Sequence, residues 1–189
     1  MIVVSVVGVS KSGKTTTIEY LTSRLTEEGY KVGSVKHIHH EDFSIDTKGT
    51  DTWRHMHAGA KVTVAVAPKE TVIIKKTENI PADLNEIIKL FKDENLDVVL
   101  IEGLHSLTAK RRDIPKIVTA KEASDLMKTL EGTDPVLAIT GVIAKKKTEV
   151  SGVNIPLIDL EKEGPTLLEL VKNQISFKNQ AESKRESLD

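Results

Sequence analysis

The 189-residue sequence contains no cysteine. This absence excludes disulfide bonds, thiolate nucleophiles and cysteine-ligated zinc, and it is compatible with a reducing cytoplasm. Aromatic residues are scarce, with one Trp, two Tyr and three Phe, so we expect no stacking platform for single-stranded nucleic acid. The 27 basic and 28 acidic side chains nearly cancel, which gives neither a basic field for nucleic acid nor an acidic excess typical of disorder.

Long apolar runs are also missing from the sequence. The N-terminal run, residues 2–7, is too short to span a membrane. It lacks a basic start and leads directly into a glycine-containing loop, so we expect neither a signal peptide nor a membrane contact. With no linker or internal repeat, the chain is expected to form a single domain over residues 1–177 and a charged, flexible tail over residues 178–189.

The most informative segment is GVSKSGKT, residues 8–15, which fits the phosphate-loop pattern G-x-x-x-x-G-K-[ST]. A buried strand is predicted before it and a helix after it, with Ile18, Leu21 and Leu25 on one helical face. Backbone N–H groups of such a loop surround an anion, and the helix N-terminus adds its positive dipole end. Lys14 is then expected to contact the terminal phosphates, and Thr15 to bind Mg²⁺. The segment predicts a nucleoside triphosphate site.

Strand-like and helix-like segments alternate along the rest of the chain. Strands are predicted over residues 30–35, 62–67, 71–74, 96–101, 115–119, 136–140 and 155–158, and helices over 53–57, 82–94, 122–130 and 165–175. Segments 62–67 and 71–74 form either a hairpin or two neighbouring strands. The alternation indicates a P-loop NTPase-like α/β fold of three layers, with a mostly parallel sheet and helices on both faces. Ligands of such sheets bind at the carboxyl ends of the strands.

Glu102 directly follows the apolar strand at residues 96–101. A carboxylate at that position holds Mg²⁺, directly or through water, in phosphate-loop proteins. Asp97 begins the same strand, five residues earlier, and at about 3.3 Å per residue it lies too far away to share the metal. We therefore expect Glu102 and Thr15 to bind the metal, and Asp97 to be structural.

Histidines gather in the first third of the chain, at His37, His39, His40, His55 and His57. They form either a solvated polar region or a group that binds a transition metal or phosphate. His37 and His39 share a face in an extended chain, whereas His55 and His57 do not share one on a helix, so their spacing does not describe a closed metal site. Lys36 is a stronger candidate for contacting an anionic ligand because it stays charged.

Two aspartates, Asp46 and Asp51, lie in a polar segment with the look of a loop or lid. They could orient water, coordinate Mg²⁺ or organise the helix that follows, whose N-cap is either Thr50 or Asp51. The base of the nucleotide is poorly specified, because the sequence has no N-K-x-D segment of the kind that reads guanine in many GTPases. The residues alone do not choose between GTP and ATP.

Several of these segments together resemble the MobB-type molybdopterin-guanine dinucleotide biosynthesis adaptor proteins. The matching pieces are GVSKSGKTT at 8–16, VKHIHH at 35–40, the spaced Asp46, Gly49 and Asp51, AGA at 58–60, LDVVLIEG at 96–103 and PKIV at 115–118. Two positions depart from the family pattern: Thr50 stands where a lysine is usual, and Leu104-His105 where an aromatic residue and a lysine are usual. The resemblance implies a homodimer, GTP with Mg²⁺, weak GTP hydrolysis, and cooperation with the guanylyltransferase that attaches GMP to molybdopterin.

The candidate site therefore comprises one set of residues for the nucleotide and a smaller set for chemistry. The expected nucleotide contacts are Gly8, Ser10, Lys11, Ser12, Gly13, Lys14, Thr15, Thr16, Lys36, His37 and Asp51. Lys14 and Glu102 are the candidate catalytic residues. Two alternative functions use the same loop: a metallochaperone-type GTPase that employs the histidines, and a small-molecule kinase, since the loop also positions a γ-phosphate for transfer.

Overall fold

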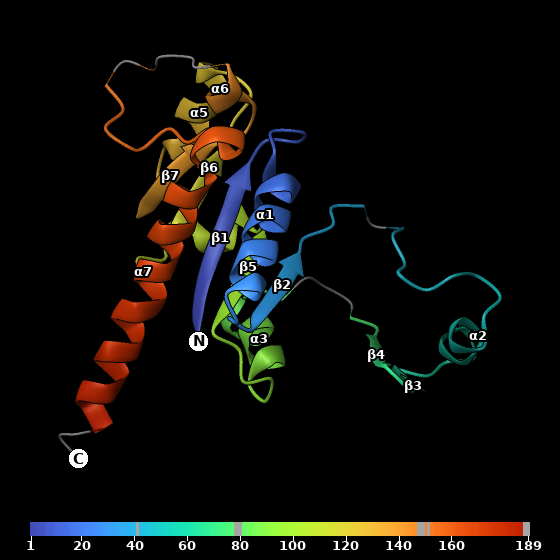
Figure 1. The fold of residues 1–189 in the computed structure, drawn as a ribbon. Coiled ribbons are helices and arrows are strands. Elements are labelled where there is room, and N and C mark those ends of the chain that lie inside the picture. Colours follow the sequence, from blue (N-terminus) through green and yellow to red (C-terminus); the bar gives the residue numbers. More distant parts are fainter. Residues whose placement is uncertain (41, 78–80, 147–149, 151, 187–189) are drawn as a thin grey trace. The chain divides into compact units, whose positions relative to one another are not determined.

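The computed structural model describes residues 1–40, 42–77, 81–146, 150 and 152–186, the last six by their backbone alone (Figure 1). The strands are β1 (Ile2–Gly8), β2 (Val32–Lys36), β3 (Val62–Ala67), β4 (Glu70–Lys75), β5 (Val98–Glu102), β6 (Lys116–Thr119) and β7 (Val136–Thr140). The helices are α1 (Lys14–Glu27), α2 (Asp51–His57), α3 (Leu84–Ile88), the 3-10 turn η1 (Lys89–Phe91), α4 (His105–Thr108), α5 (Ala123–Leu130), α6 (Val142–Lys145) and α7 (Leu160–Glu186).

Five of the strands form one parallel sheet in the order β2-β5-β1-β6-β7 (Figure 1). The central strand β1 is apolar and β-branched, as buried parallel strands are, and it leads straight into the phosphate loop. The register pairs Glu102 of β5 with Val6 of β1 on one side and with Lys36 of β2 on the other. Glu102 therefore lies at the carboxyl edge of the sheet, at the level of the loop.

Helices cover both faces of this sheet, which makes three layers and confirms the predicted fold class. On one face, Leu21 and Leu25 of α1 pack with Leu167 and Val171 of α7 against Val4 and its neighbours in the sheet. The other face is covered by two further apolar clusters, which are built around α3 and around α5 and α6. The apolar spacing that predicted α1 is the spacing of the residues that pack into the first cluster.

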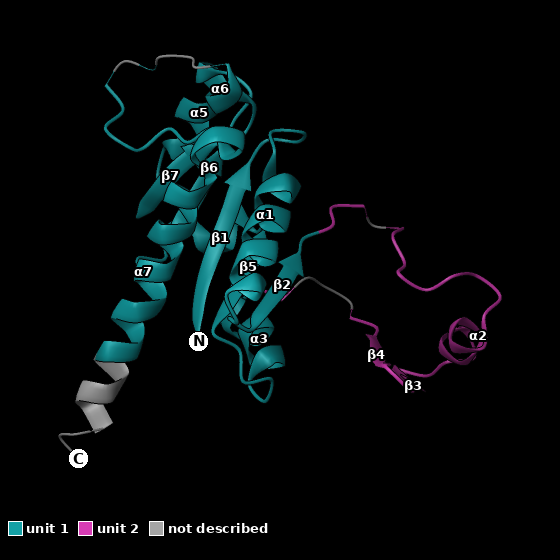
Figure 2. Cartoon of the chain, viewed as in Figure 1, with its two compact units in different colours: residues 1–37, 83–189 teal, residues 38–82 magenta. Residues whose placement is uncertain are grey.

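The chain divides into two compact units, coloured separately in Figure 2. Unit 1 comprises Met1–His37 and Asp83–Asp189 and contains the parallel sheet, whereas unit 2 comprises Ile38–Ala82. Within unit 2, β3 and β4 form an antiparallel hairpin, which decides between the two arrangements predicted for them. Thr50 is the N-cap of α2, since its hydroxyl accepts a hydrogen bond from Trp53 N at 3.3 Å.

The helix predicted over residues 82–94 is shorter than expected. The α3 helix starts only after Asp83, whose carboxylate caps it by accepting a hydrogen bond from Asn85 N at 2.9 Å. After Ile88 the chain tightens into η1, and Asn95 then adopts a left-handed φ of 46° before β5. Short helices gain little from their own hydrogen bonds, so local turns override the apolar spacing here.

The predictions for the last third of the chain were wrong in two places. Residues 155–158 form no strand but a single parallel bridge, Ile139 to Leu157, because Pro156 has no N–H to extend a ladder. Helix α7 begins at Leu160 rather than Pro165, since Asp159 caps it by accepting from Glu161 N at 3.1 Å. The helix continues to Glu186. The flexible tail over residues 178–189 stays a prediction, and its last three residues lie outside the described part of the chain.

Candidate nucleotide site

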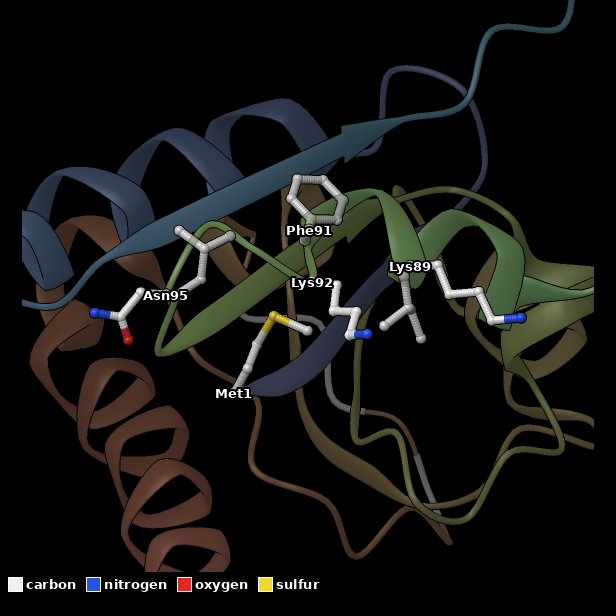
Figure 3. Close-up of a pocket in the computed structure, with 7 residues that line it drawn as sticks. Met1, Lys89, Phe91, Lys92 and Asn95 are labelled. Carbon is white, nitrogen blue, oxygen red and sulfur yellow. The ribbon is translucent and has the colours of Figure 1, made fainter.

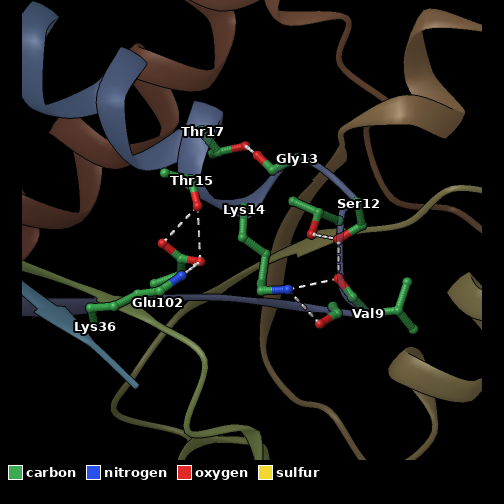
Figure 4. Close-up of polar contacts among 10 residues, drawn as sticks. Val9, Ser12, Gly13, Lys14, Thr15, Thr17, Lys36 and Glu102 are labelled. Atoms are coloured by element: carbon green, nitrogen blue, oxygen red, sulfur yellow. Dashed lines mark hydrogen bonds and ion pairs between the residues drawn. The ribbon is translucent and has the colours of Figure 1, made fainter. Parts of the chain in front are cut away.

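The loop between β1 and α1 is held together by its own lysine. Lys14 Nζ donates to the carbonyl oxygens of Gly8 at 3.0 Å and Val9 at 2.6 Å (Figure 4). Burial lowers the pKa of the Lys14 ammonium, nearby Glu102 opposes that shift, and the charge of Lys36 adds to it. The ammonium thus lies beside the loop backbone, within the electrostatic reach of both neighbouring charges.

Glu102 is the acidic centre of the site. The Thr15 hydroxyl faces its carboxylate, with 3.0 Å from Oγ1 to each carboxylate oxygen, and Lys36 forms an ion pair with the same group from the edge strand β2 (Figure 4). The Glu102 side chain is only 8% exposed. A hydroxyl and a carboxylate that meet at the start of a helix are a pair of oxygen ligands of the kind that Mg²⁺ takes. The predicted metal pair, Thr15 and Glu102, is therefore brought together and fits that ion.

The charges of the site favour an anion. Two ammonium groups, Lys14 and Lys36, stand against one carboxylate, and the N-terminus of the 14-residue helix α1 adds its positive end. Gly13 precedes α1 in a left-handed conformation with φ of 111°, which a glycine adopts without strain. The arrangement can bind a phosphate chain beside a divalent cation.

The remaining predicted contacts differ in their burial and in the unit that carries them. Ser10, Lys11 and Thr16 are exposed along the loop and the first turn of α1, whereas Ser12 is fully buried. His37 extends β2 beside the site, with its backbone N donating to Glu102 O at 3.0 Å. Asp51 belongs to unit 2, where it begins α2 and pairs with Arg54 at 3.4 Å. Its contact with the nucleotide stays a prediction.

Two residues near Glu102 in sequence have structural partners instead. Asp97 holds the amino ends of β2 and β5 together, because its carboxylate accepts from Lys31 N at 2.8 Å, as its place at the start of the strand indicated. His105 contacts Thr133 rather than the phosphate loop, with 2.8 Å from Nε2 to Oγ1. Burial and the charge of Lys116 lower the pKa of His105. His105 is therefore not a substitute for the lysine that is usual near that position.

Three further residues support the loop, and the sequence alone assigned none of them a contact with it. The Thr17 hydroxyl donates to Gly13 O at 2.9 Å. Thr119, at the end of β6, contacts Ser12, and Gly141, after β7, packs against the backbone of the same residue. A threonine in the first turn of a helix is a weak signal. The other two lie more than a hundred positions from the loop, so only sheet topology, which suggested that Thr140 and Gly141 could lie near the base, points to them.

The histidine group acquires no metal site among the residues that the structure describes, where no three His, Cys, Asp or Glu side chains gather to hold an ion. His57 stacks on Trp53, with 4.5 Å between the ring centroids. This contact is internal to unit 2. Within the described ranges, no helix has both the length and the apolar character needed to cross a membrane.

A cavity of about 400 Å³ lies at the other end of the sheet, beside the start of β1 (Figure 3). Its lining is apolar at Met1, Phe91 and Leu96, with Lys89 and Lys92 at its edge. The seven residues of β1 separate the start of that strand from the phosphate loop, which at about 3.3 Å per residue places the two roughly 20 Å apart. This cavity is therefore not part of the nucleotide site.

A parallel sheet with a phosphate loop after its central strand, and a carboxylate facing the loop's threonine, defines the class of P-loop nucleotide-binding proteins. The model of one family within that class, MobB (molybdopterin guanine dinucleotide synthesis protein B), matches residues 3–143. The chain belongs to the MobB family.

Relatives with curated names agree with this membership. A protein of Methanocaldococcus jannaschii, named as an adapter of molybdopterin-guanine dinucleotide biosynthesis, is 42% identical over 129 residues, 67% of this chain and 51% of the relative. This chain thus spans about half the length of that relative. The Haemophilus influenzae adapter protein of the same name is 32% identical over 71% of each chain. The crystal structure of Bacillus subtilis MobB is similar with a TM-score of 0.73 and 30% identity, over 92% of this chain and 98% of that one.

Proposed function

We propose that this protein is a GTP-binding adapter in molybdopterin guanine dinucleotide biosynthesis, acting in the cytoplasm with the guanylyltransferase that attaches GMP to molybdopterin. The observation that carries the nucleotide part is the meeting of Thr15, Glu102 and two lysines at the phosphate loop. The names of the relatives support the pathway. The guanine dinucleotide in the relatives' names supports GTP over ATP, a choice that the residues of the loop do not make.

The same geometry supports slow hydrolysis of GTP with Mg²⁺. Thr15 and Glu102 would hold the ion, which when bound neutralises charge on the phosphates. Lys14 would stabilise the negative charge that develops on the terminal phosphate. Glu102 already accepts hydrogen bonds from Thr15 and Lys36, so it is poorly placed to take a proton from an attacking water. A site with charge stabilisation but without a positioned base is expected to turn over slowly.

A homodimer is the quaternary structure that unit 2 supports. One face of the hairpin carries Val62, Val64, Val66 and Ile73, which are 48%, 52%, 79% and 68% exposed. They share a face because Val64 pairs with Ile73 in the antiparallel register and the other two valines lie two residues away on the same strand. Contiguous exposed apolar surface of this kind marks an interface. We assign a second copy of this chain to it, in agreement with the dimer implied by the resemblance.

Titration calorimetry with GTP, GDP and ATP, with and without Mg²⁺, tests the proposal. We expect the wild type to bind GTP in preference to ATP. Lys14→Ala should weaken GTP binding about a hundredfold, because a hydrogen bond to a charged group is worth about 1.5–3 kcal/mol. Lys89→Ala removes the same charge from η1, beside the cavity at the start of β1. It is the matched control and should bind as the wild type does. Equal GTP affinity for the wild type and Lys14→Ala would rule out this site.

A further titration with molybdopterin tests the pathway, since an adapter in this step should bind the acceptor or its guanylyltransferase. Neither alternative function gains support from the described residues. Among the described residues the histidines form no group of three that could hold a metal ion. The metallochaperone hypothesis therefore has no supporting site in that part of the chain. Phosphorylation of a metabolite by ATP in the presence of the protein would favour the kinase instead.

A further inference from the structure

Ser12 is the one phosphate-loop residue whose side chain is completely buried. Its hydroxyl lies 2.8 Å from Val9 O and 2.6 Å from the hydroxyl of Thr119 (Figure 4). The Thr119 hydroxyl also lies 3.2 Å from Val7 O. Each hydroxyl has a single hydrogen to donate. The shortest contacts are satisfied together when Thr119 donates to Ser12 and Ser12 donates to the Val9 carbonyl.

The Val9 carbonyl is also the closer of the two oxygens that accept from Lys14 Nζ, at 2.6 Å. A continuous chain of hydrogen bonds therefore runs from Thr119 through Ser12 and Val9 to the lysine that is expected to contact the phosphates. Linked hydrogen bonds polarise one another and restrict the positions of the groups between them. The carbonyl that Lys14 contacts is thus oriented by a strand on the far side of the loop.

The backbone of Ser12 is constrained from the next strand along. Its carbonyl accepts a hydrogen bond from Val142 N at 3.2 Å. Gly141, with φ of 90°, comes so close that a Cβ built on it would lie 2.1 Å from Ser12 O. Gly8 likewise leaves no room, since a Cβ there would lie 2.0 Å from Thr119 O. Ser12 is held by its side chain at the end of β6 and by its backbone after β7.

We propose that Thr119 is a positioning residue of the nucleotide site, which sets the place of Lys14 through Ser12 and the Val9 carbonyl. This inference rests on the proposed function, because it assigns a role in binding the phosphates of GTP. Thr119 itself touches no ligand atom in this scheme. Its contribution is to fix the loop in the shape that surrounds a phosphate before the nucleotide arrives, which lowers the cost of ordering the loop on binding.

The test compares Thr119→Val, which keeps the side-chain shape but removes the hydroxyl, with Thr119→Ser, which keeps the hydroxyl. Loss of one buried hydrogen bond should weaken the affinity for GTP about five- to tenfold. Thr119→Ser should restore it to within about twofold. Ser12→Ala breaks the same chain and should show the same loss, and the double variant should lose no more than either single one, because the two residues act as a unit.

A second buried Ser–Thr pair, between strand β1 and helix α4, provides the control. Ser5 Oγ donates to Thr108 Oγ1 at 3.2 Å, in the middle of β1 and away from the loop. Thr108→Val should lower the stability to urea by an amount similar to Thr119→Val and leave GTP affinity unchanged. This variant separates a general loss of stability from a displaced loop.

Calorimetric titration of each folded variant with GTP and Mg²⁺ gives the decisive values. Unchanged affinity in Thr119→Val or in Ser12→Ala, or an equal loss in Thr108→Val, would overturn the inference. If Thr119→Val fails to fold, Ser12→Ala and Thr119→Ser still decide the question. A wild type that does not bind GTP would overturn the proposed function instead, and this inference with it.

Discussion

Unit 1 and unit 2 differ in the burial of their apolar side chains. In unit 1 the valines and leucines of the sheet and of α1 and α7 are buried in continuous clusters. In unit 2 the described residues bury only Met56 and Thr63, and the three valines of β3 lie on the exposed side of the hairpin. The inner side of β3 carries Thr63 and Ala65 instead.

The difference concerns what each unit needs in order to be stable. Burying apolar surface is the main favourable contribution to folding, at about 25 cal/mol per Å², and unit 1 obtains it within one chain. A two-stranded hairpin is only marginally stable in water by itself. The larger side chains of β3 face outward, where a partner can cover them. Unit 1 therefore buries its apolar side chains within itself, whereas the hairpin of unit 2 leaves an apolar face for the second copy that we propose.

The largest expected effect is on the dimer interface that we propose for unit 2. Val64→Asp combined with Val66→Asp places two charges on the outer face of the hairpin, and a charge buried without a partner at an interface costs several kcal/mol. We expect a dimer to become a monomer in light scattering, with GTP binding retained. Leu90→Asp is the matched control, because Leu90 of η1 is 74% exposed in unit 1. A dimer that survives the double substitution would place the interface elsewhere.

An intermediate effect is expected within the site of unit 1. Glu102→Gln keeps the shape of the side chain but removes its negative charge, which is expected to bind the metal. The enhancement of GTP binding and hydrolysis by Mg²⁺ should therefore fall about tenfold or more, because a contact to a charged group is lost. Asp97→Ala, at the other end of β5, should leave the Mg²⁺ dependence unchanged and reduce stability by about 1 kcal/mol. Titrations at several Mg²⁺ concentrations measure both. A Mg²⁺ dependence altered by Asp97→Ala alone would reverse the assignment.

The last prediction concerns stability alone and leaves binding unchanged: it tests whether a buried polar group of unit 1 contributes to folding. Lys116 is fully buried, and its ammonium donates to the carbonyl oxygens of Arg111 at 2.6 Å and Asp134 at 2.5 Å. Lys116→Met leaves both carbonyls without this donor, at a cost of about 1–3 kcal/mol. Urea unfolding measures the loss, and Lys128→Met on the exposed surface of α5 should stay within about 0.5 kcal/mol of the wild type. Equal stability of the two variants would show that the buried lysine contributes nothing.

The sequence was sufficient to predict features that depend on neighbouring residues. The phosphate loop, the strand before it and the carboxylate after β5 are each local patterns, and the structure brings Thr15 and Glu102 together as predicted. The structural role of Asp97 also followed from position alone, since a parallel strand separates its two ends. The resemblance was confirmed by the family match.

The sequence was insufficient to predict contacts between segments that lie far apart along the chain. The short helices α4 and α6 have too few residues for a helical period to show. The contact between Ser12 and Thr119 joins positions 107 residues apart, so it depends on β1 and β6 being neighbours in the sheet. The outward valines of β3 were also not foreseeable. An alternating sequence predicts that the two faces of a strand differ, but it does not predict which face another molecule covers.

Unit 2 is an insertion between β2 and α3, and β2 is the edge strand of the parallel sheet. The strand pairs that shape the phosphate loop, β1 with β5 and β1 with β6, lie inside the sheet and include no residue of the insertion. The entropic cost of a longer or shorter insertion grows only slowly with its length. Mutation can therefore remodel the hairpin that we propose as the dimer interface while the strand pairs around the phosphate loop stay intact, so the two regions are free to evolve at different rates.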